Sequence, residues 1–167
     1  MIIWLASYPK SGNTWLRSLI ANYYFSETGD FNFELLEKID SFPSNKYFRK
    51  YLDKFKKPHD TSKYWIKEQE KINQSKSLKF FKTHNALCKI EGNQFTNKEN
   101  TLGVIYIIRD PRNVISSLSN HYQISTDEAF QFMTDEKRGI VSKEKDRFLG
   151  FQALFSWKLN QKSWVDN

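Results

Sequence analysis

Residues 2–20 read IIWLASYPKSGNTWLRSLI, and this stretch decides the fold. The apolar run at residues 2–6 is typical of a buried strand, and the segment that starts at Asn13 has the composition of a helix. A short turn with lysine, serine, glycine and threonine joins the two. This order suits a phosphate, because free backbone N–H groups and the helix dipole meet an anion at a helix N-terminus.

The turn itself carries several groups that bind anions. Gly12 allows close backbone approach, Lys10 adds a positive charge, and Ser11 and Thr14 supply hydroxyl donors. The alternative is an ordinary connection in which these side chains only cap the helix. We predict an anionic, nucleotide-like ligand at this loop.

Length and composition predict one globular domain over residues 1–167. The chain has 14 Phe, 8 Tyr and 5 Trp, enough for a hydrophobic core, and no repeat or linker divides it. No apolar stretch reaches the length of a membrane span, and the single cysteine, Cys88, excludes an internal disulfide and gives no metal cluster. We therefore expect a cytoplasmic protein that contacts no membrane and holds no metal.

The net charge of +7 at pH 7 favours anionic partners such as a phosphorylated cofactor or an acidic glycan. Most of the lysines are expected on solvated helix surfaces with mixed charge. Because no nucleic-acid-binding motif accompanies the charge, we do not expect a nucleic-acid partner.

Strands and helices alternate along the chain. Residues 78–82 and 102–108 are expected to be further buried strands, and the second of these (LGVIYII) is typical of a central parallel strand covered on both faces. Helices are expected at residues 13–24 and 111–122. This alternation predicts an α/β fold, a doubly wound parallel sheet with flanking helices, in which ligands bind beyond the carboxyl ends of the strands.

Further helices are expected near residues 47–55 and 64–72, and at residues 128–133 behind a capping box that begins at Ser125. Residues 145–164 predict a longer amphipathic helix. Its apolar surface would be formed by Phe148, Phe151, Leu154, Phe155, Trp157 and Leu159.

A second motif, Lys82-Thr83-His84, ends the second strand. Strand alternation places Lys82 and His84 on one face. A histidine there can accept a proton from a hydroxyl while the lysine neutralises charge on an oxygen. The alternative is a hydrogen-bonded structural histidine.

A third motif follows the third strand, where Arg109 emerges and a helix begins two residues later. Asn113, Ser117 and His121 form one polar stripe on that helix. Arg109 and Ser117 can together hold a second phosphate through charge-assisted and hydroxyl hydrogen bonds. An arginine–aspartate surface pair beside a helix cap is the alternative.

Together the three motifs resemble the sulfotransferases that use 3′-phosphoadenosine 5′-phosphosulfate (PAPS). The matching segments are residues 8–15 (YPKSGNTW), 82–84 (KTH) and 109–117 (RDPRNVISS), in the order and at the separations of that family. Residues 155–164 give a weaker match to a later aromatic helix. The resemblance implies the sulfotransferase fold, which is related to the P-loop NTPases.

The resemblance also implies a role for each matching residue. Lys10, Ser11, Gly12, Asn13, Thr14 and Trp15 would surround the 5′-phosphosulfate, with Trp15 also stacked on the adenine. Arg109 and Ser117 would hold the 3′-phosphate. His84 would be the general base, and Lys10 and Lys82 would stabilise charge during transfer. Sulfuryl transfer requires positioning and electrostatic stabilisation, and no metal is required.

The chain departs from the family pattern at three places. Asn13 stands where many relatives have threonine, and Asn85-Ala86 follows His84 where cytosolic members have Leu-Pro. Relatives also continue beyond the equivalent of residue 167 through another core strand and a basic segment that closes over the cofactor. We therefore expect a fold truncated at its C-terminus, weak cofactor binding, and exposed apolar surface that favours a homo-oligomer.

Two other functions compete with sulfotransfer. In a P-loop kinase or NTPase, Asp110 would bind Mg²⁺ after a strand, although the loop lacks the G-x-x-x-x-G-K-[ST] spacing. A degenerate, non-catalytic module would bind a nucleotide or another anion without turnover. The expected acceptor is a hydroxyl, or an amine, of a small molecule or glycan. The aromatic residues between positions 42 and 65 could line its pocket, but we interpret them as core packing.

Overall fold

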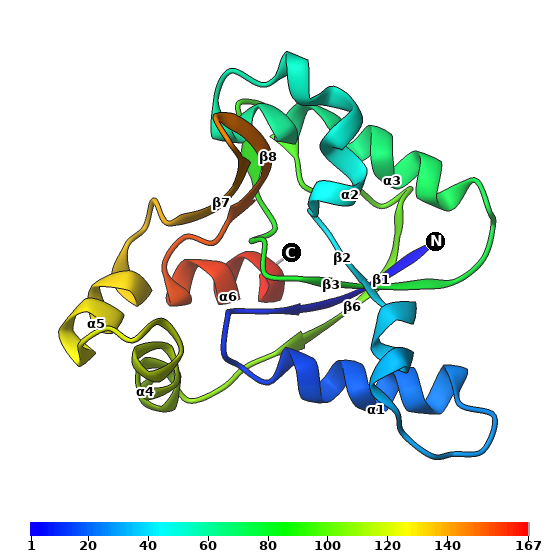
Figure 1. The fold of residues 1–167 in the computed structure, drawn as a ribbon, viewed down its shortest axis with the longest axis horizontal. Coiled ribbons are helices and arrows are strands. Elements are labelled where there is room, and N and C mark those ends of the chain that lie inside the picture. The colour runs from blue at the N-terminus through cyan, green and yellow to red at the C-terminus, as the bar shows by residue number, and fades with distance from the viewer. Residues whose placement is uncertain (167) are drawn as a thin grey trace.

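The computed structural model describes residues 1–166, and its centre is a parallel sheet that brings distant parts of the chain together (Figure 1). The strand order is β2-β3-β1-β6, and every neighbouring pair is parallel. The four strands are β2 (Asp40–Ser41), β3 (Lys79–Thr83), β1 (Ile2–Ser7) and β6 (Thr101–Ile107). The predicted α/β class with a parallel sheet flanked by helices is therefore confirmed.

Helices and short 3₁₀ segments surround the sheet. The helices are α1 (Asn13–Phe25), α2 (Asn45–Phe48), α3 (Trp65–Asn73), α4 (Pro111–Tyr122), α5 (Thr126–Thr134) and α6 (Trp157–Val165). The 3₁₀ segments are η1 (Phe33–Lys38), η2 (Arg49–Lys54) and η3 (Pro58–Tyr64). Two antiparallel pairs complete the fold: β4 (Lys89–Ile90) with β5 (Asn93–Gln94), and β7 (Gly139–Glu144) with β8 (Arg147–Ala153).

Alternation along β1 builds a different core on each face of the sheet. Leu5 lies on the α1 side with Ala21 and Phe80. Trp4 lies on the other side in a cluster of aromatic rings, and its indole N–H donates to Thr101 Oγ1 at 2.9 Å. β1 is therefore apolar on both faces, which fits its position between β3 and β6.

The prediction that residues 102–108 form the central strand was wrong. This segment is β6, which lies at the edge of the sheet in the described part of the chain, and Leu102, Val104 and Ile105 are each at least 40% exposed. Apolar, β-branched composition favours a pleated surface, but it does not state which neighbours cover that surface. The interior positions belong to β3 and β1, which each have a strand on both sides.

The long helix predicted over residues 145–164 was also wrong. The apolar spacing fits a helix, but the chain turns at Lys145, whose φ is 53°, and then forms β8 before the shorter α6. Gly150 in mid-segment weakens a helix. A helix would also have lost the strand pairing that places the Phe151 ring over Gly139, where a Cβ atom would meet the ring at 2.5 Å.

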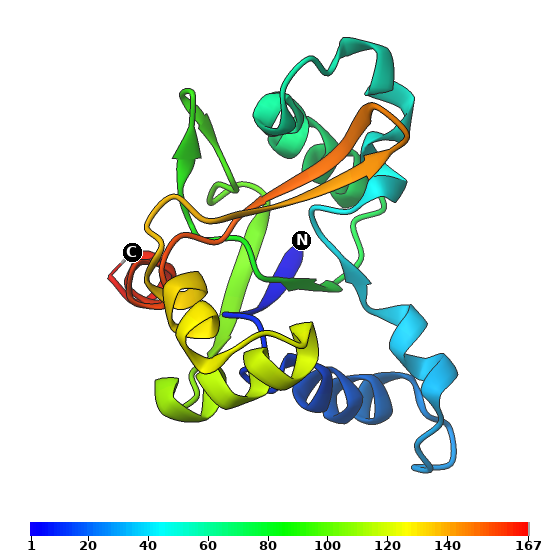
Figure 2. The ribbon, with the colours of Figure 1, turned by 60° about the vertical axis from the view of Figure 1, so that its left-hand side comes forward.

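The β7–β8 hairpin spans from α5 and α6 to the helices of residues 45–73 (Figure 2). Phe148 and Phe151 pack against the aromatic core, and exposed ion pairs join Glu144 to Arg49 and Arg147 to Asp53. Exposed ion pairs of this kind contribute little to the free energy of folding, so the aromatic contacts hold the hairpin against the core.

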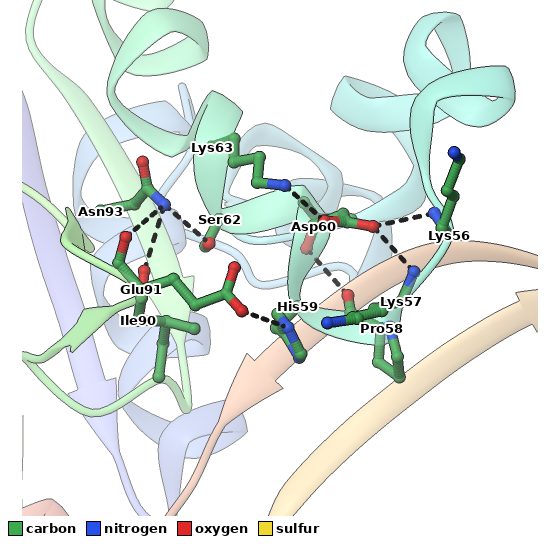
Figure 3. A network of polar contacts seen from close by, with 11 residues as sticks. Lys56, Lys57, Pro58, His59, Asp60, Ser62, Lys63, Ile90, Glu91 and Asn93 are labelled. Carbon is green, nitrogen blue, oxygen red and sulfur yellow. Dashed lines mark hydrogen bonds and ion pairs between the residues drawn. The ribbon is translucent and has the colours of Figure 1, made fainter.

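A buried carboxylate organises the start of η3 (Figure 3). Asp60 accepts hydrogen bonds from the backbone N–H groups of Lys56 at 2.8 Å and Lys57 at 2.7 Å, and it pairs with Lys63 at 2.6 Å. The hydrogen bond from Lys63, followed by those from the backbone, lowers the pKa of Asp60 to about 2. Nearby, His59 bonds to Glu91 at 2.9 Å, which ties η3 to the turn between β4 and β5.

Substitution of Phe95 tests how much the aromatic core contributes to stability. Its side chain is fully buried and contacts the rings of Trp4, Phe42, Trp65 and Trp164. We expect Phe95→Ala to lower the free energy of unfolding by about 3–5 kcal/mol in urea titrations, because the cavity cannot collapse between rigid rings. Phe33→Ala, at a position 79% exposed, is the matched control and should change it by less than about 0.5 kcal/mol. Equal losses would contradict this description of the core.

Candidate active site

The turn between β1 and α1 forms an open helix N-terminus. Gly12 is the N-cap residue with φ 99° and offers no side-chain acceptor, and the first turn of α1 holds no acidic residue. The first backbone N–H groups of α1 therefore have no local competitor for an anion. Lys10 also adopts a positive φ of 65°, which folds the turn back on itself.

Ser11 and Asn13 carry buried polar atoms that the turn does not satisfy. Ser11 is 5% exposed, and its Oγ has no hydrogen-bond partner within the described residues. Asn13 is 4% exposed, and its Nδ2 donates to Leu5 O at 2.8 Å and to Ser7 Oγ at 3.1 Å, whereas its buried Oδ1 has no partner within the described residues. Because a buried orphan hydroxyl is costly, Ser11 Oγ is a donor in place for a ligand oxygen.

The three sequence motifs meet in one cavity of about 500 Å³ at the carboxyl ends of the strands. Of the predicted site residues, all except Ser11 line it, and Ser11 lies buried in the turn beside it. The lining residues are Pro9, Lys10, Gly12, Asn13, Thr14, Trp15, Lys82, His84, Arg109, Ser117, His121, Tyr122 and Ile140. Trp15 is 70% exposed, so its ring presents an open face.

The prediction for this site missed Tyr122 and Ile140. Tyr122 is the last residue of α4, and Ile140 lies on β7, a strand that the sequence did not reveal. Tyr122 follows His121 at the end of α4, but helical spacing does not place it on the stripe of Asn113, Ser117 and His121. No local signal pointed to Ile140, because the hairpin brings it to the cavity from another part of the fold.

Arg109 joins the third motif to the first. Its Nη1 donates to Lys10 O at 2.9 Å. The guanidinium therefore lies beside the turn of residues 8–12 between β1 and α1, which we call the anion loop. The neighbouring Asp110 is already engaged: it caps α4 by accepting from the Arg112 N–H at 2.9 Å and pairs with the Arg112 side chain at 2.6 Å. The arginine–aspartate pair of the alternative interpretation is therefore formed by Arg112, and Arg109 stays available to a ligand.

His84 is held in one ring orientation. Its Nδ1 lies 2.8 Å from the carbonyl oxygen of Ser7, which can only accept, so Nδ1 carries the hydrogen and Nε2 keeps its lone pair. The backbone oxygen of His84 accepts from Asn160 Nδ2 at 3.0 Å, so α6 positions it from the other side. Asn160 is a supporting residue that the sequence did not indicate.

The residues that follow His84 also help to hold it in position. Asn85 is fully buried, its Oδ1 accepts from the Ala153 N–H at 2.8 Å, and its carbonyl oxygen accepts from the Trp164 indole at 2.9 Å. At Asn85-Ala86 the chain departs from the Leu-Pro pattern. The hydrogen bonds of Asn85 connect this turn to β8 and α6.

The cavity has an unbalanced positive charge. Within residues 1–166, none of Lys10, Arg17, Lys82 and Arg109 forms an ion pair with an acidic side chain. Burial, with the charges of Arg17 and Lys10 nearby, lowers the pKa of Lys82. Burial and the Lys82 charge lower the pKa of His84 to about 3. The imidazole is therefore neutral near pH 7, and the remaining positive charge favours an anionic ligand in the cavity.

Comparison with known families agrees with this geometry. A family model described as "Sulfotransferase domain" matches residues 2–166. No curated protein was found to match the chain. Among the described residues, no helix has both the length and the apolar character needed to cross a membrane, and no three His, Cys, Asp or Glu side chains gather as metal ligands.

The depressed pKa of His84 can be tested by NMR. We expect the His84 ring signals to stay constant between about pH 5 and pH 8, because the neutral form persists down to about pH 3. Only the unfolded chain then binds this proton below about pH 6.5, so the His84 contribution to stability should decrease as the pH falls from about 6.5 to 3. A His84 midpoint above pH 6 would contradict the electrostatic description.

Proposed function

Because the chain belongs to the sulfotransferase domain family, we propose that it transfers a sulfuryl group from PAPS to a hydroxyl, or an amine, of an acceptor. The observation that carries the proposal is the cavity itself. It combines an uncapped helix N-terminus, cations without acidic partners, and one neutral imidazole whose Nε2 keeps its lone pair. This set suits a donor with several negative charges, whose transfer requires a base and no redox chemistry.

The residues around the cavity suit the two ends of PAPS. Lys10, the backbone at Gly12 and Asn13, and the Ser11 and Thr14 hydroxyls would bind the 5′-phosphosulfate. Arg109 and Ser117 would bind the 3′-phosphate, and the exposed Trp15 ring would stack on the adenine. The orphaned Ser11 Oγ and the cations support this fit, since within residues 1–166 the hydroxyl has no hydrogen-bond partner and the cations have no acidic one.

His84 acts on the acceptor in this proposal. When bound, PAPS supplies the sulfuryl group and leaves as 3′,5′-adenosine bisphosphate (PAP). His84 Nε2 accepts the acceptor proton while Nδ1–H stays bonded to Ser7 O. Lys10 and Lys82 stabilise the negative charge that grows on the oxygen between phosphorus and sulfur as it loses the sulfuryl group. The negative charge of a bound donor also offsets the cations that depress the His84 pKa, which makes the imidazole a stronger base.

The P-loop NTPase alternative has less support. It would need Asp110 to hold Mg²⁺, but that carboxylate caps α4 and pairs with Arg112. A non-catalytic anion-binding module would need the loop and the cations but would not need an oriented His84. The hydrogen bonds to Ser7 and Asn160 therefore favour an enzyme.

Ligand-dependent melting tests the identity of the donor. At about 100 times its Kd, PAP should raise the Tm by about 5 °C or more, whereas adenosine 5′-phosphate and ATP should have smaller effects at equal concentration. Arg109→Ala should reduce the PAP shift to that of adenosine 5′-phosphate. Arg112→Ala is the matched control and should keep the PAP shift, since Arg112 pairs with Asp110. Stabilisation by ATP and Mg²⁺ alone would favour the NTPase.

The role of His84 can be tested by transfer of ³⁵S from labelled PAPS to a panel of hydroxyl and amine acceptors. His84→Ala should lower kcat by about 10²–10⁴-fold, because the acceptor loses its base, while PAP affinity stays within about twofold. His59→Ala, which removes a histidine bonded to Glu91, should leave transfer unchanged, and so should EDTA. Unchanged transfer by the His84 variant would remove this residue from the mechanism.

A further inference from the structure

Two side chains of the active-site cavity have no part in the proposed donor site. Tyr122 is the last residue of α4, and Ile140 is the second residue of β7. Both line the cavity that contains His84. In the proposed function, the other lining residues except Pro9 and His121 bind the donor, stabilise charge or act as the base. Tyr122 and Ile140 are therefore left for contact with the acceptor.

The Tyr122 ring is held in place by two other rings. It stacks on the Phe132 ring, with centroids 5.6 Å apart and an angle of 27° between the planes. The His121 ring lies 4.8 Å from it in an edge arrangement. Tyr122 is nevertheless 43% exposed, so part of a fixed ring remains free. A surface that is already ordered loses little conformational entropy when a ligand binds to it.

Ile140 adds an aliphatic surface with the same support. It packs against the apolar cluster that includes Leu118 and Phe132. Because Tyr122 stacks on Phe132, one cluster supports both side chains. The β7–β8 hairpin therefore brings an aliphatic side chain to the cavity that the tyrosine ring also lines. We call Tyr122 and Ile140 together the apolar wall.

The apolar wall is separate from the groups that would hold the donor phosphates. Tyr122 follows Ser117 by five residues on α4, which corresponds to about 7–8 Å along the helix axis. The lysines and arginine of the lining are Lys10, Lys82 and Arg109, and all three act on the donor in the proposed function. An anionic acceptor would compete with the donor for these cations, whereas an apolar acceptor would bury surface against the wall.

We propose that the apolar wall binds the acceptor and selects an alcohol carried on an aromatic body over an acidic sugar. The inference rests on the proposed function, because the donor site and the base define the part of the cavity that the acceptor enters. The acceptor hydroxyl points to His84 Nε2, while the aromatic body contacts the Tyr122 ring and the Ile140 side chain.

Acceptor binding can be measured without turnover by calorimetry on the complex with PAP. Naphthylmethanol should bind at least about tenfold more tightly than methyl glucuronide, which carries a carboxylate. Tyr122→Ala and Ile140→Ser should each weaken naphthylmethanol binding about five- to tenfold, because apolar contact is lost, while PAP affinity stays within about twofold. Tyr122→Phe keeps the ring and should keep the affinity.

Phe130→Ala is the matched control. Phe130 is an aromatic residue on α5 that is 55% exposed and borders a different groove, so its loss should leave naphthylmethanol binding unchanged. Since Tyr122→Ala also loses the stack on Phe132, Tm is measured for each variant, and Ile140→Ser decides the outcome if Tyr122→Ala does not fold.

The possible results separate this proposal from the proposed function. Tighter binding of methyl glucuronide, or naphthylmethanol binding that Ile140→Ser leaves unchanged, would overturn the role of the apolar wall. A loss of PAP affinity in Ile140→Ser or Tyr122→Phe would place the wall in the donor site and would also overturn it. An unsubstituted protein that binds no PAP would instead contradict the proposed function, and the same titrations on the free protein would still decide whether the wall binds naphthylmethanol.

Discussion

The parallel pairing of β1 with β3 on one side and β6 on the other is the constraint on which the site depends. Ala6 is level with Thr83, and Ser7 is level with Ile107, so the three strands end at one edge of the sheet. Each strand then delivers one motif to that edge: the anion loop after β1, His84 after β3 and Arg109 after β6. Any shift in this register would separate the base from the loop.

The site concentrates positive charge at the cost of stability. Burial and the charges of Arg17 and Lys10 lower the pKa of Lys82, and burial and the charges of Lys82, Arg17 and Lys10 lower that of His84. No acidic side chain among the described residues forms an ion pair with these cations. Elsewhere the chain pairs buried charges, as in the Asp60 network of Figure 3. The contrast between the two sites indicates a functional surface, because a cluster of cations without acidic partners lowers stability and favours an anionic ligand.

Much of this arrangement could be predicted from local sequence, because each motif lies within a few residues of a strand end. The order strand, loop and helix placed Lys10, His84, Arg109 and Ser117 at one edge before any contact was known. What local pattern could not reveal was pairing across long separations. The apolar residues 148–155 fit a helix by spacing, but the rings of η2, η3 and α3 stabilise them as a hairpin, and that hairpin brings Ile140 to the cavity. Support of His84 by Asn160 likewise depends on the position of α6.

The central place of β1 also governs the order of assembly. Ser7 and His84 are separated by 77 positions, and Trp4 and Thr101 by 97, so the middle strand of the sheet is synthesised long before either neighbour exists. Until then its apolar faces have no sheet to join, and closing such large loops slows folding. The nascent chain must therefore keep residues 2–7 from wrong partners while about a hundred more residues emerge. Building the site around β1 therefore delays its completion until both neighbouring strands have been synthesised.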